Sequence, residues 1–315
     1  MRQIIAIGES VFHTVFAGNV PQSSYVGGRI ANAASSLALA GLPVTMVSEC
    51  ADDRVGDIVV DFLKNNRVNV SSVDRYANGT TPLTAIFRDP DGSERRVKYG
   101  TYPADRFDVM WPRINEDDIV IFGSLYAVEN EQRKRLYEIL QYAFDRKAVV
   151  VYLPGFECRI NYSITKVMPN ILENFELADV VIADEHDMKD IFPNEDGEKC
   201  YRHHMIYCHR YVHIADGGRT TIFGRGVKSE VASEPIPDTQ SLGWQAGYVA
   251  GFVFGMIEAG ITHRSIGAVE QETWNRVADT AYSFAADCAA SASNCITAPF
   301  AADMAQRLEK ALQEE

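Results

Sequence analysis

Short runs of apolar, often β-branched residues alternate along this chain with segments of helical periodicity, and this alternation constrains the fold more than any other feature. The runs at residues 4–7, 44–48, 119–122, 149–153 and 180–183 have the length of buried strands. Helical segments between them provide the crossover connections that parallel strands require. The sequence therefore predicts an α/β protein with a mostly parallel sheet.

The pattern changes between residues 84 and 99, where two segments flank the turn Asp89-Pro90-Asp91-Gly92. An Asp-Gly pair between alternating strands is a strong signal for a β-hairpin. A hairpin in a parallel α/β chain is expected to leave the main sheet and to form a lid or a contact between subunits. No repeat, low-complexity tract or evident linker divides the chain.

Composition excludes several classes of partner. The 315 residues carry a formal net charge of −13, whereas a surface for nucleic acid or anionic lipid needs a basic face. The longest apolar run, around residues 248–257, is too short and too rich in glycine to span a membrane. The six cysteines are scattered without a disulfide framework, which favours a reducing, cytoplasmic location. We therefore expect a small-molecule ligand.

The stretch from residue 238 to residue 258 combines a turn with an apolar helix. A loop that leads into a helix N-terminus presents backbone N–H groups and the positive end of the helix dipole, which together can hold an anion. Gly247, Gly251 and Gly255 recur at every fourth residue on one stripe of this helix. Each glycine costs about 1 kcal/mol relative to alanine, so the stripe indicates close packing. The pattern fits a binding loop and a buried core helix equally well.

Four motifs occur in a fixed order along the chain. They are Gly27-Gly28-x-x-x-Asn32 with Leu39-x-Gly41 and Asp52-Asp53-x-x-Gly56; Thr84 with residues 89–92 and Tyr99; residues 178–187; and Asp238-Thr239 with Ala250-Gly251-Phe252 and Gly255. In this order they resemble the signatures of the ribokinase (PfkB) family of carbohydrate and nucleoside kinases. The resemblance covers essentially the whole chain and implies a ribokinase-like, Rossmann-type three-layer sandwich.

The resemblance implies a single α/β domain over residues 1–315, with a small β lid formed near residues 10–25 and 82–101. Lids in this family often pair across a dimer, so a homodimer through the lid is expected. The implied reaction is phosphoryl transfer from Mg-ATP to a hydroxyl group of a small sugar or nucleoside. Such transfer depends on positioning and electrostatic stabilisation, with one carboxylate to accept the hydroxyl proton.

The resemblance also assigns binding roles to individual positions. The substrate would be bound by Gly27, Gly28, Asn32 and His13, and the nucleotide side would be formed by Gly217, Gly243, Asp184 and Asp187. His13 stands where the family usually has an aspartate that holds substrate hydroxyls. Asp184 and Asp187 would hold Mg²⁺ together with the nucleotide, because carboxylate oxygens suit this hard cation.

The chain departs from the family at the catalytic position. The aspartate of the family's Gly-Ala-Gly-Asp turn aligns with Trp244 when Asp238 is the anchor, and with Ala246 when residues 250–252 are the anchor. Residues 239–257 contain no Asp or Glu. Asp238 is a candidate substitute base, and loss of a general base commonly costs about 10² to 10⁴ in rate. The sequence therefore predicts either a weakly active kinase or a non-catalytic pseudokinase that acts as a ligand-binding or regulatory protein.

A separate cluster of histidines and cysteines lies late in the chain. Its members are Cys200, His203, His204, Cys208, His209 and His213. These residue types are zinc ligands, and His209 and His213 have the spacing of one helical turn. On a strand, which the resemblance implies for this segment, the same spacing spans about 13 Å. A zinc-binding module and ordinary surface and core histidines are both consistent with the sequence.

Overall fold

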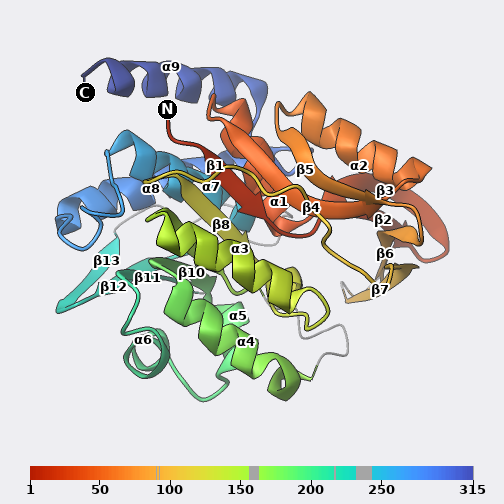
Figure 1. Cartoon of the computed structure of the whole chain (residues 1–315), viewed down its shortest axis with the longest axis horizontal. Helices are drawn as coiled ribbons and strands as arrows, with labels where there is room; N and C mark the ends of the chain where they lie inside the picture. The colour runs from red at the N-terminus through yellow and green to blue at the C-terminus, as the bar shows by residue number, and fades with distance from the viewer. Residues whose placement is uncertain (90, 92, 156–162, 216–217, 232–242, 315) are drawn as a thin grey trace.

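A large twisted sheet forms the centre of the molecule (Figure 1). The structure is a computed structural model that describes all residues except 90, 92, 156–162, 216–217, 232–242 and 315. The nine strands of the sheet, in spatial order, are β13 (Val227–Val231), β12 (Thr220–Gly224), β11 (Arg210–Ile214), β10 (Val180–Asp184), β9 (Val149–Leu153), β8 (Ile119–Gly123), β1 (Ile4–Ile7), β4 (Val44–Ala51) and β5 (Asn69–Tyr76). From β11 to β5, each strand is parallel to its neighbours. β12 runs antiparallel to both of its neighbours, β11 and β13. The predicted α/β class with a mostly parallel sheet is confirmed.

Helices cover both faces of this sheet, which gives three layers (Figure 1). One face carries α1 (Arg29–Leu39), α7 (Trp244–Glu258), α8 (Gln271–Ala290) and α9 (Ala298–Glu314), and the opposite face carries α3 (Arg133–Asp145) and α4 (Ile164–Leu177). The strands divide their side chains between the layers, as the two-residue period of a strand requires. Ile4 of β1 joins the core under α1, and Ile5 joins the core under α3.

The remaining helical segments connect strands or follow one another in the chain. They are α2 (Arg54–Asn65), the 3₁₀ turn η1 (Leu125–Ala127), α5 (Glu185–Ile191) and α6 (Gly197–His204). Asp53, Asp184 and Asp196 cap the N-termini of α2, α5 and α6 by accepting a backbone N–H bond with the side chain. These caps fix where the chain leaves each loop and enters each helix.

The glycine stripe of α7 packs against α8. A Cβ atom on Gly251 would lie 2.7 Å from Cα of Ala281 and 2.7 Å from the carbonyl oxygen of Thr280. A backbone atom cannot move aside as a flexible side chain can, so only glycine permits this approach. The stripe therefore reflects close packing of α7 against α8.

A second sheet of four strands lies beside the large one (Figure 1). Its order is β3 (Val20–Gly27), β2 (Val11–Ala17), β6 (Thr80–Arg88) and β7 (Glu94–Thr101). β2 and β6 are parallel neighbours in the middle, and each forms an antiparallel hairpin with its outer strand. The hairpin expected around residues 84–99 thus belongs to a sheet outside the main one. We call this sheet the lid sheet.

Two further features bear on the expectations from composition. In the described parts of the chain, no helix combines the length and the apolar character that a membrane crossing needs. Five of the cysteines lie in the described residues, and all five are buried and free of disulfide bonds.

Candidate functional site

A cavity of about 210 Å³ lies where the lid sheet meets the carboxyl ends of the parallel strands. Open α/β sheets bind their ligands at this edge. The lid sheet contributes His13, Tyr25, Thr84, Arg96 and Lys98; the strand ends contribute Glu9, Ser124 and Gly155; and the starts of α1 and α7 contribute Gly28, Arg29, Asn32, Gly243, Gln245 and Ala246. Segments far apart in the sequence therefore form one site.

The residues predicted to bind substrate all line this cavity. The imidazole of His13 stacks on Tyr25 with ring centroids 5.1 Å apart. Gly27 leaves room for that imidazole, since a Cβ atom there would lie 2.5 Å from Cδ2 of His13. Gly28 has a φ of 119° and lies so close to the carbonyl oxygen of Glu9 that a side chain would collide with it. The glycine pair thus brings the start of α1 against the cavity.

Two polar atoms of the cavity wall are buried without a hydrogen-bond partner among the described residues. They are Oδ1 of Asn32 and Oγ of Ser124. Buried polar atoms almost always have hydrogen-bond partners in folded proteins. Two such atoms without a partner in a cavity wall therefore indicate where hydroxyl groups of a ligand can bind. Ser124 has a φ of 60°, a strained conformation for a non-glycine residue that is frequent at functional sites.

Sequence reasoning had not assigned a role to Ser124. The residue follows the buried strand β8 directly and lies at the carboxyl edge of the parallel sheet. That position, rather than any motif, is the signal that could have identified it.

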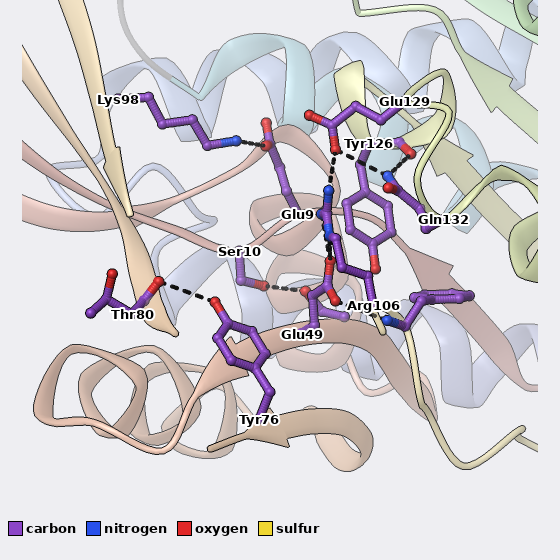
Figure 2. A network of polar contacts seen from close by, with 12 residues as sticks. Glu9, Ser10, Glu49, Tyr76, Thr80, Lys98, Arg106, Tyr126, Glu129 and Gln132 are labelled. Atoms are coloured by element: carbon purple, nitrogen blue, oxygen red, sulfur yellow. Dashed lines mark hydrogen bonds and ion pairs between the residues drawn. The ribbon is translucent and has the colours of Figure 1, made fainter. Parts of the chain in front are cut away.

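The charged side chains of the cavity are of both signs. Nζ of Lys98 lies 3.6 Å from a carboxylate oxygen of Glu9, as Figure 2 shows. Arg29, Arg96 and Lys98 all line the cavity, and Glu9 and Glu129 are its acidic residues. Arg96 is already paired with Glu94 at 3.1 Å, as Lys98 is with Glu9, so an anionic ligand would share these cations with their acidic partners.

A buried ion-pair network centred on Arg106 lies next to this wall of the cavity (Figure 2). Arg106 donates to Glu49 at 2.5 Å and 2.9 Å and to Glu129 at 3.0 Å, and its guanidinium stacks 3.5 Å from the ring centre of Tyr102. Burial raises the pKa of Glu49, although Arg106 opposes this effect. The network fastens the segment after β7 to β4 and to the loop after η1, so it holds Glu129 at the edge of the cavity.

The start of α7 faces the cavity without a carboxylate. Gly243 is the N-cap with a φ of 117°, and a side chain there would meet the backbone of Asn294. The first turn of the helix contains no acidic residue. Both side chains are buried in the hydrophobic core, Trp244 at 8% and Ala246 at 2% exposure, but of the two only Ala246 lines the cavity. Of the two positions expected for the base, Ala246 is therefore the one at the site.

Arg29 and Gln245 cover the two carboxylates expected to bind Mg²⁺. Nη1 of Arg29 lies 2.6 Å from Oδ2 of Asp187, and Nη2 donates to Oε1 of Gln245 at 2.9 Å. The amide nitrogen of Gln245 in turn donates to Asp184. Arg29 and Gln245 line the cavity, and Asp184 and Asp187 do not. Four residues from three helices and the end of β10 thus form one closed network.

This network does not fit a Mg²⁺ site. Asp187 is 2% exposed and already has a cationic partner, and the guanidinium of Arg29 also lies 3.9 Å from Asp184. A dication at these oxygens would be placed beside a fixed positive charge. The pKa of Asp187 is raised to about 6, chiefly by burial; Arg29 opposes this rise, and neighbouring Asp184 adds to it. The expected role of the two aspartates in holding Mg²⁺ is not supported by this arrangement.

Two expected site residues, Asp238 and Gly217, lie outside the described residues, so neither role is tested. The cysteine and histidine cluster is described, and its six members do not assemble into one site. His213 contacts the hydroxyl of Tyr211 at 2.9 Å, and His209 lies 3.9 Å from Asp179.

The two cysteines of that cluster are buried. Burial raises the pKa of Cys200 and of Cys208 to about 12, which disfavours the thiolate that zinc requires. Of the six residues in the cluster, His203 and His204 have ligand atoms close to each other. The third residue near them is Glu195, which was not in the predicted set. The zinc module predicted over residues 200–213 is therefore wrong in its ligand set.

Comparisons with known proteins identify the family. Residues 16–240 match the sequence model of the pfkB family carbohydrate kinases. The chain belongs to this family. The match ends at residue 240, before the start of α7. The resemblance found from the motifs is thus confirmed, and Trp244 and Ala246, the two positions expected for the base, lie outside the matched region.

Curated relatives of this PfkB-family chain are sugar-acid kinases by name. The 5-dehydro-2-deoxygluconokinase of Clostridium tetani (strain Massachusetts / E88) is 25% identical over 261 residues, which cover 75% of this chain and 73% of the relative. The protein of the same name from Geobacillus thermodenitrificans (strain NG80-2) is 25% identical over 269 residues, covering 81% and 79%.

Solved structures show the same fold at lower identity. Fructokinase from Xylella fastidiosa with bound ATP superposes with a TM-score of 0.80 at 16% identity, over 99% of both chains. Aminoimidazole riboside kinase from Salmonella enterica, complexed with aminoimidazole riboside and an ATP analog, has a TM-score of 0.78 at 14% identity over 97% of this chain and 99% of that one. The ribokinase-like fold is confirmed.

Proposed function

We propose that this PfkB-family protein binds a small sugar acid in the cavity under the lid sheet and transfers phosphate weakly or not at all. The observation that carries the proposal is the network of Arg29 and Gln245 with Asp187 and Asp184. It neutralises the carboxylate pair on which the family's Mg²⁺ role would fall. The start of α7 beside it supplies no base.

The ligand class follows from the cavity wall. Oδ1 of Asn32 and Oγ of Ser124 suit ligand hydroxyls, and Arg96 and Lys98 suit a carboxylate. The name of the curated relatives denotes an acid derived from gluconate, which carries both groups. The cavity of about 210 Å³ has room for a ligand of this size.

A second candidate function is an active kinase with a relocated base. Glu9 and Glu129 are carboxylates in the cavity wall, and Asp238 precedes α7 in the sequence. The names of the relatives and of the neighbouring structures are those of kinases, two of them with ATP or an ATP analog bound. ATP would then be the phosphate donor.

One experiment separates the two functions. Binding of 5-dehydro-2-deoxygluconate, 2-keto-3-deoxygluconate, fructose, ribose and a nucleoside is measured by calorimetry, and ADP formation from Mg-ATP is measured with each. We expect binding of a sugar acid without ADP formation at kinase rates. Turnover with any of these compounds would favour the relocated base, and absence of binding by all of them would contradict both candidates.

We also propose a homodimer formed through the lid sheet. β3 is an edge strand of this sheet, its residues 20–24 are exposed, and Val20 is 65% exposed. An edge strand presents unpaired backbone groups to a second strand. Light scattering on the purified protein should give twice the chain mass of 35.0 kDa. A mass of one chain at micromolar concentration would contradict the dimer.

A further inference from the structure

We propose that Glu195, His203 and His204 form a binding site for Zn²⁺ that is separate from the cavity. Glu195 lies in the loop between α5 and α6, and the two histidines are the last residues of α6. Their ligand atoms all lie within 4.8 Å of one another. None of the three residues lines the cavity, so the site does not depend on the function proposed above.

The distances fit three ligands around one ion. Nδ1 of His203 lies 3.1 Å from Oε1 of Glu195, and Nε2 of His204 lies 3.2 Å from Oε2. Zinc bonds to nitrogen and oxygen of about 2.0 to 2.2 Å place tetrahedral ligands about 3.3 Å apart. Each oxygen of the carboxylate thus faces one imidazole at the separation that a shared ion requires.

The carboxylate of Glu195 already holds the two imidazoles together. Oε2 of Glu195 and Nε2 of His204 are both buried and lie 3.2 Å apart. The other carboxylate oxygen lies within hydrogen-bond distance of Nδ1 of His203. A bound ion would replace these two contacts with bonds to the metal.

The surrounding residues fix the orientation of the ligands. The ring of Phe192 lies flat against His204, with centroids 3.8 Å apart and an angle of 2° between the rings. The rings of His203 and His204 are nearly perpendicular, at 88°. The side chain of Asp196 caps α6 beside Glu195, which defines where the helix begins. The stacked ring of His204 therefore has little side-chain freedom left to lose when an ion binds.

The ligand set selects a borderline transition metal. Two imidazoles and one carboxylate suit Zn²⁺, whereas Mg²⁺ and Ca²⁺ prefer all-oxygen sites. His203 is 56% exposed at its side chain, so water can occupy a fourth position. A bound ion would fasten the loop between the two helices to the end of α6.

Zinc binding to the whole chain tests the inference. Protein freed of metal is titrated with Zn²⁺ against a chromogenic chelator, which gives affinity and stoichiometry. We expect one zinc per chain. Loss of an outer-shell partner costs about 10- to 100-fold in metal affinity, so loss of a direct ligand in Glu195→Gln or in the double variant His203→Gln/His204→Gln should cost at least as much. His186→Gln, a change at an exposed histidine outside the cluster, should leave binding unchanged.

The inference would be overturned if the wild type bound no zinc at micromolar concentration, or if the variants bound zinc as well as the wild type. The Co²⁺ spectrum provides an independent readout. Nitrogen and oxygen ligands give d–d bands without a sulfur-to-metal charge-transfer band, and the appearance of such a band would assign the metal to a cysteine instead. Circular dichroism of each variant shows that lost binding is not lost folding, and Glu195→Gln keeps the shape of the side chain.

Discussion

Trp244 and Ala246 stand two residues apart at the start of α7, and they have different surroundings. Both belong to the hydrophobic core, but Ala246 also lines the cavity, at the positive end of the helix dipole, and Trp244 does not. We expect Trp244→Asp to lower the free energy of unfolding by about 3–5 kcal/mol, because it removes a large buried side chain and buries a carboxyl group. The loss of unfolding free energy in Ala246→Asp should be smaller than that in Trp244→Asp by at least about 2 kcal/mol. The reason is that the new carboxylate can reach the cavity and lies at the helix N-terminus, where negative charge is favourable.

Urea denaturation of both variants measures this difference, and equal losses would contradict the assignment. Ala246→Asp also places a carboxylate at one of the two positions expected for the family's base. A gain of ADP formation in Ala246→Asp alone would show that the position is the one that limits phosphate transfer.

The buried carboxyl group of Asp187 predicts a specific dependence of stability on pH. Burial raises its pKa from the ordinary value of 3.8 to about 6. Between these values the folded state holds a proton that the unfolded chain has lost, so this group's contribution is fully present below pH 3.8 and is lost as the pH rises through 6. The unfolding free energy should fall by up to about 1.4 kcal/mol per pH unit relative to Asp187→Asn. Urea denaturation at pH 4, 5, 6 and 7 gives the difference between the two proteins. If the unfolding free energy of the wild type minus that of Asp187→Asn stays constant or increases with pH, the raised pKa of Asp187 is contradicted.

The residues of the site could be predicted only in part. The glycine pair and Asn32 lie close together in the sequence and form a motif that can be read directly. Arg29 meets Asp187 across 158 positions and Gln245 across 216 positions. Pairing over such separations depends on how strands and helices are brought together, so the residue types alone did not show that the carboxylates have a cationic partner.

At the scale of elements, the contact between α7 and α8 permits a graded test. A Cβ atom at Gly251 would lie 2.7 Å from backbone atoms of α8, and one at Gly255 would lie 3.1 Å from Cα of Val277. Alanine gains about 1 kcal/mol in helix propensity at either position. Overpacking costs about 1–3 kcal/mol, so Gly251→Ala should destabilise and Gly255→Ala should be closer to neutral. Thermal denaturation of the matched pair checks this order, and a more stable Gly251→Ala would show that the helices can separate without cost.

The elements that the sequence predicted best are the buried ones. Interior strands such as β9 are apolar throughout and are recognisable from short runs. β5 and β13 form the two edges of the large sheet and are polar at many positions, since one side or both are exposed. Their sequences carry little apolar signal, and sequence reasoning did not place them.

At the scale of the whole molecule, a ligand that binds only the folded state must raise its stability. A ligand at 100 times its dissociation constant adds about 2.7 kcal/mol, which corresponds to about 5 °C in melting temperature for a chain of this size. We expect a sugar acid to produce this shift, because it would join the lid sheet to the edge of the large sheet. Mg-ATP should produce little shift, because Arg29 already neutralises Asp187 and lies beside Asp184.

A matched control distinguishes a ligand in the cavity from a ligand elsewhere. Ser124→Ala removes a hydroxyl that has no partner among the described residues, so it should keep the melting temperature of the free protein and reduce the shift caused by the sugar acid. Thr280→Ala removes a buried hydroxyl on α8, away from the cavity wall, and should lower the melting temperature without reducing the shift. The melting temperature is followed by circular dichroism with and without ligand. An undiminished shift in Ser124→Ala would place the ligand outside the cavity, and a shift with Mg-ATP alone would show that the nucleotide binds despite the arginine.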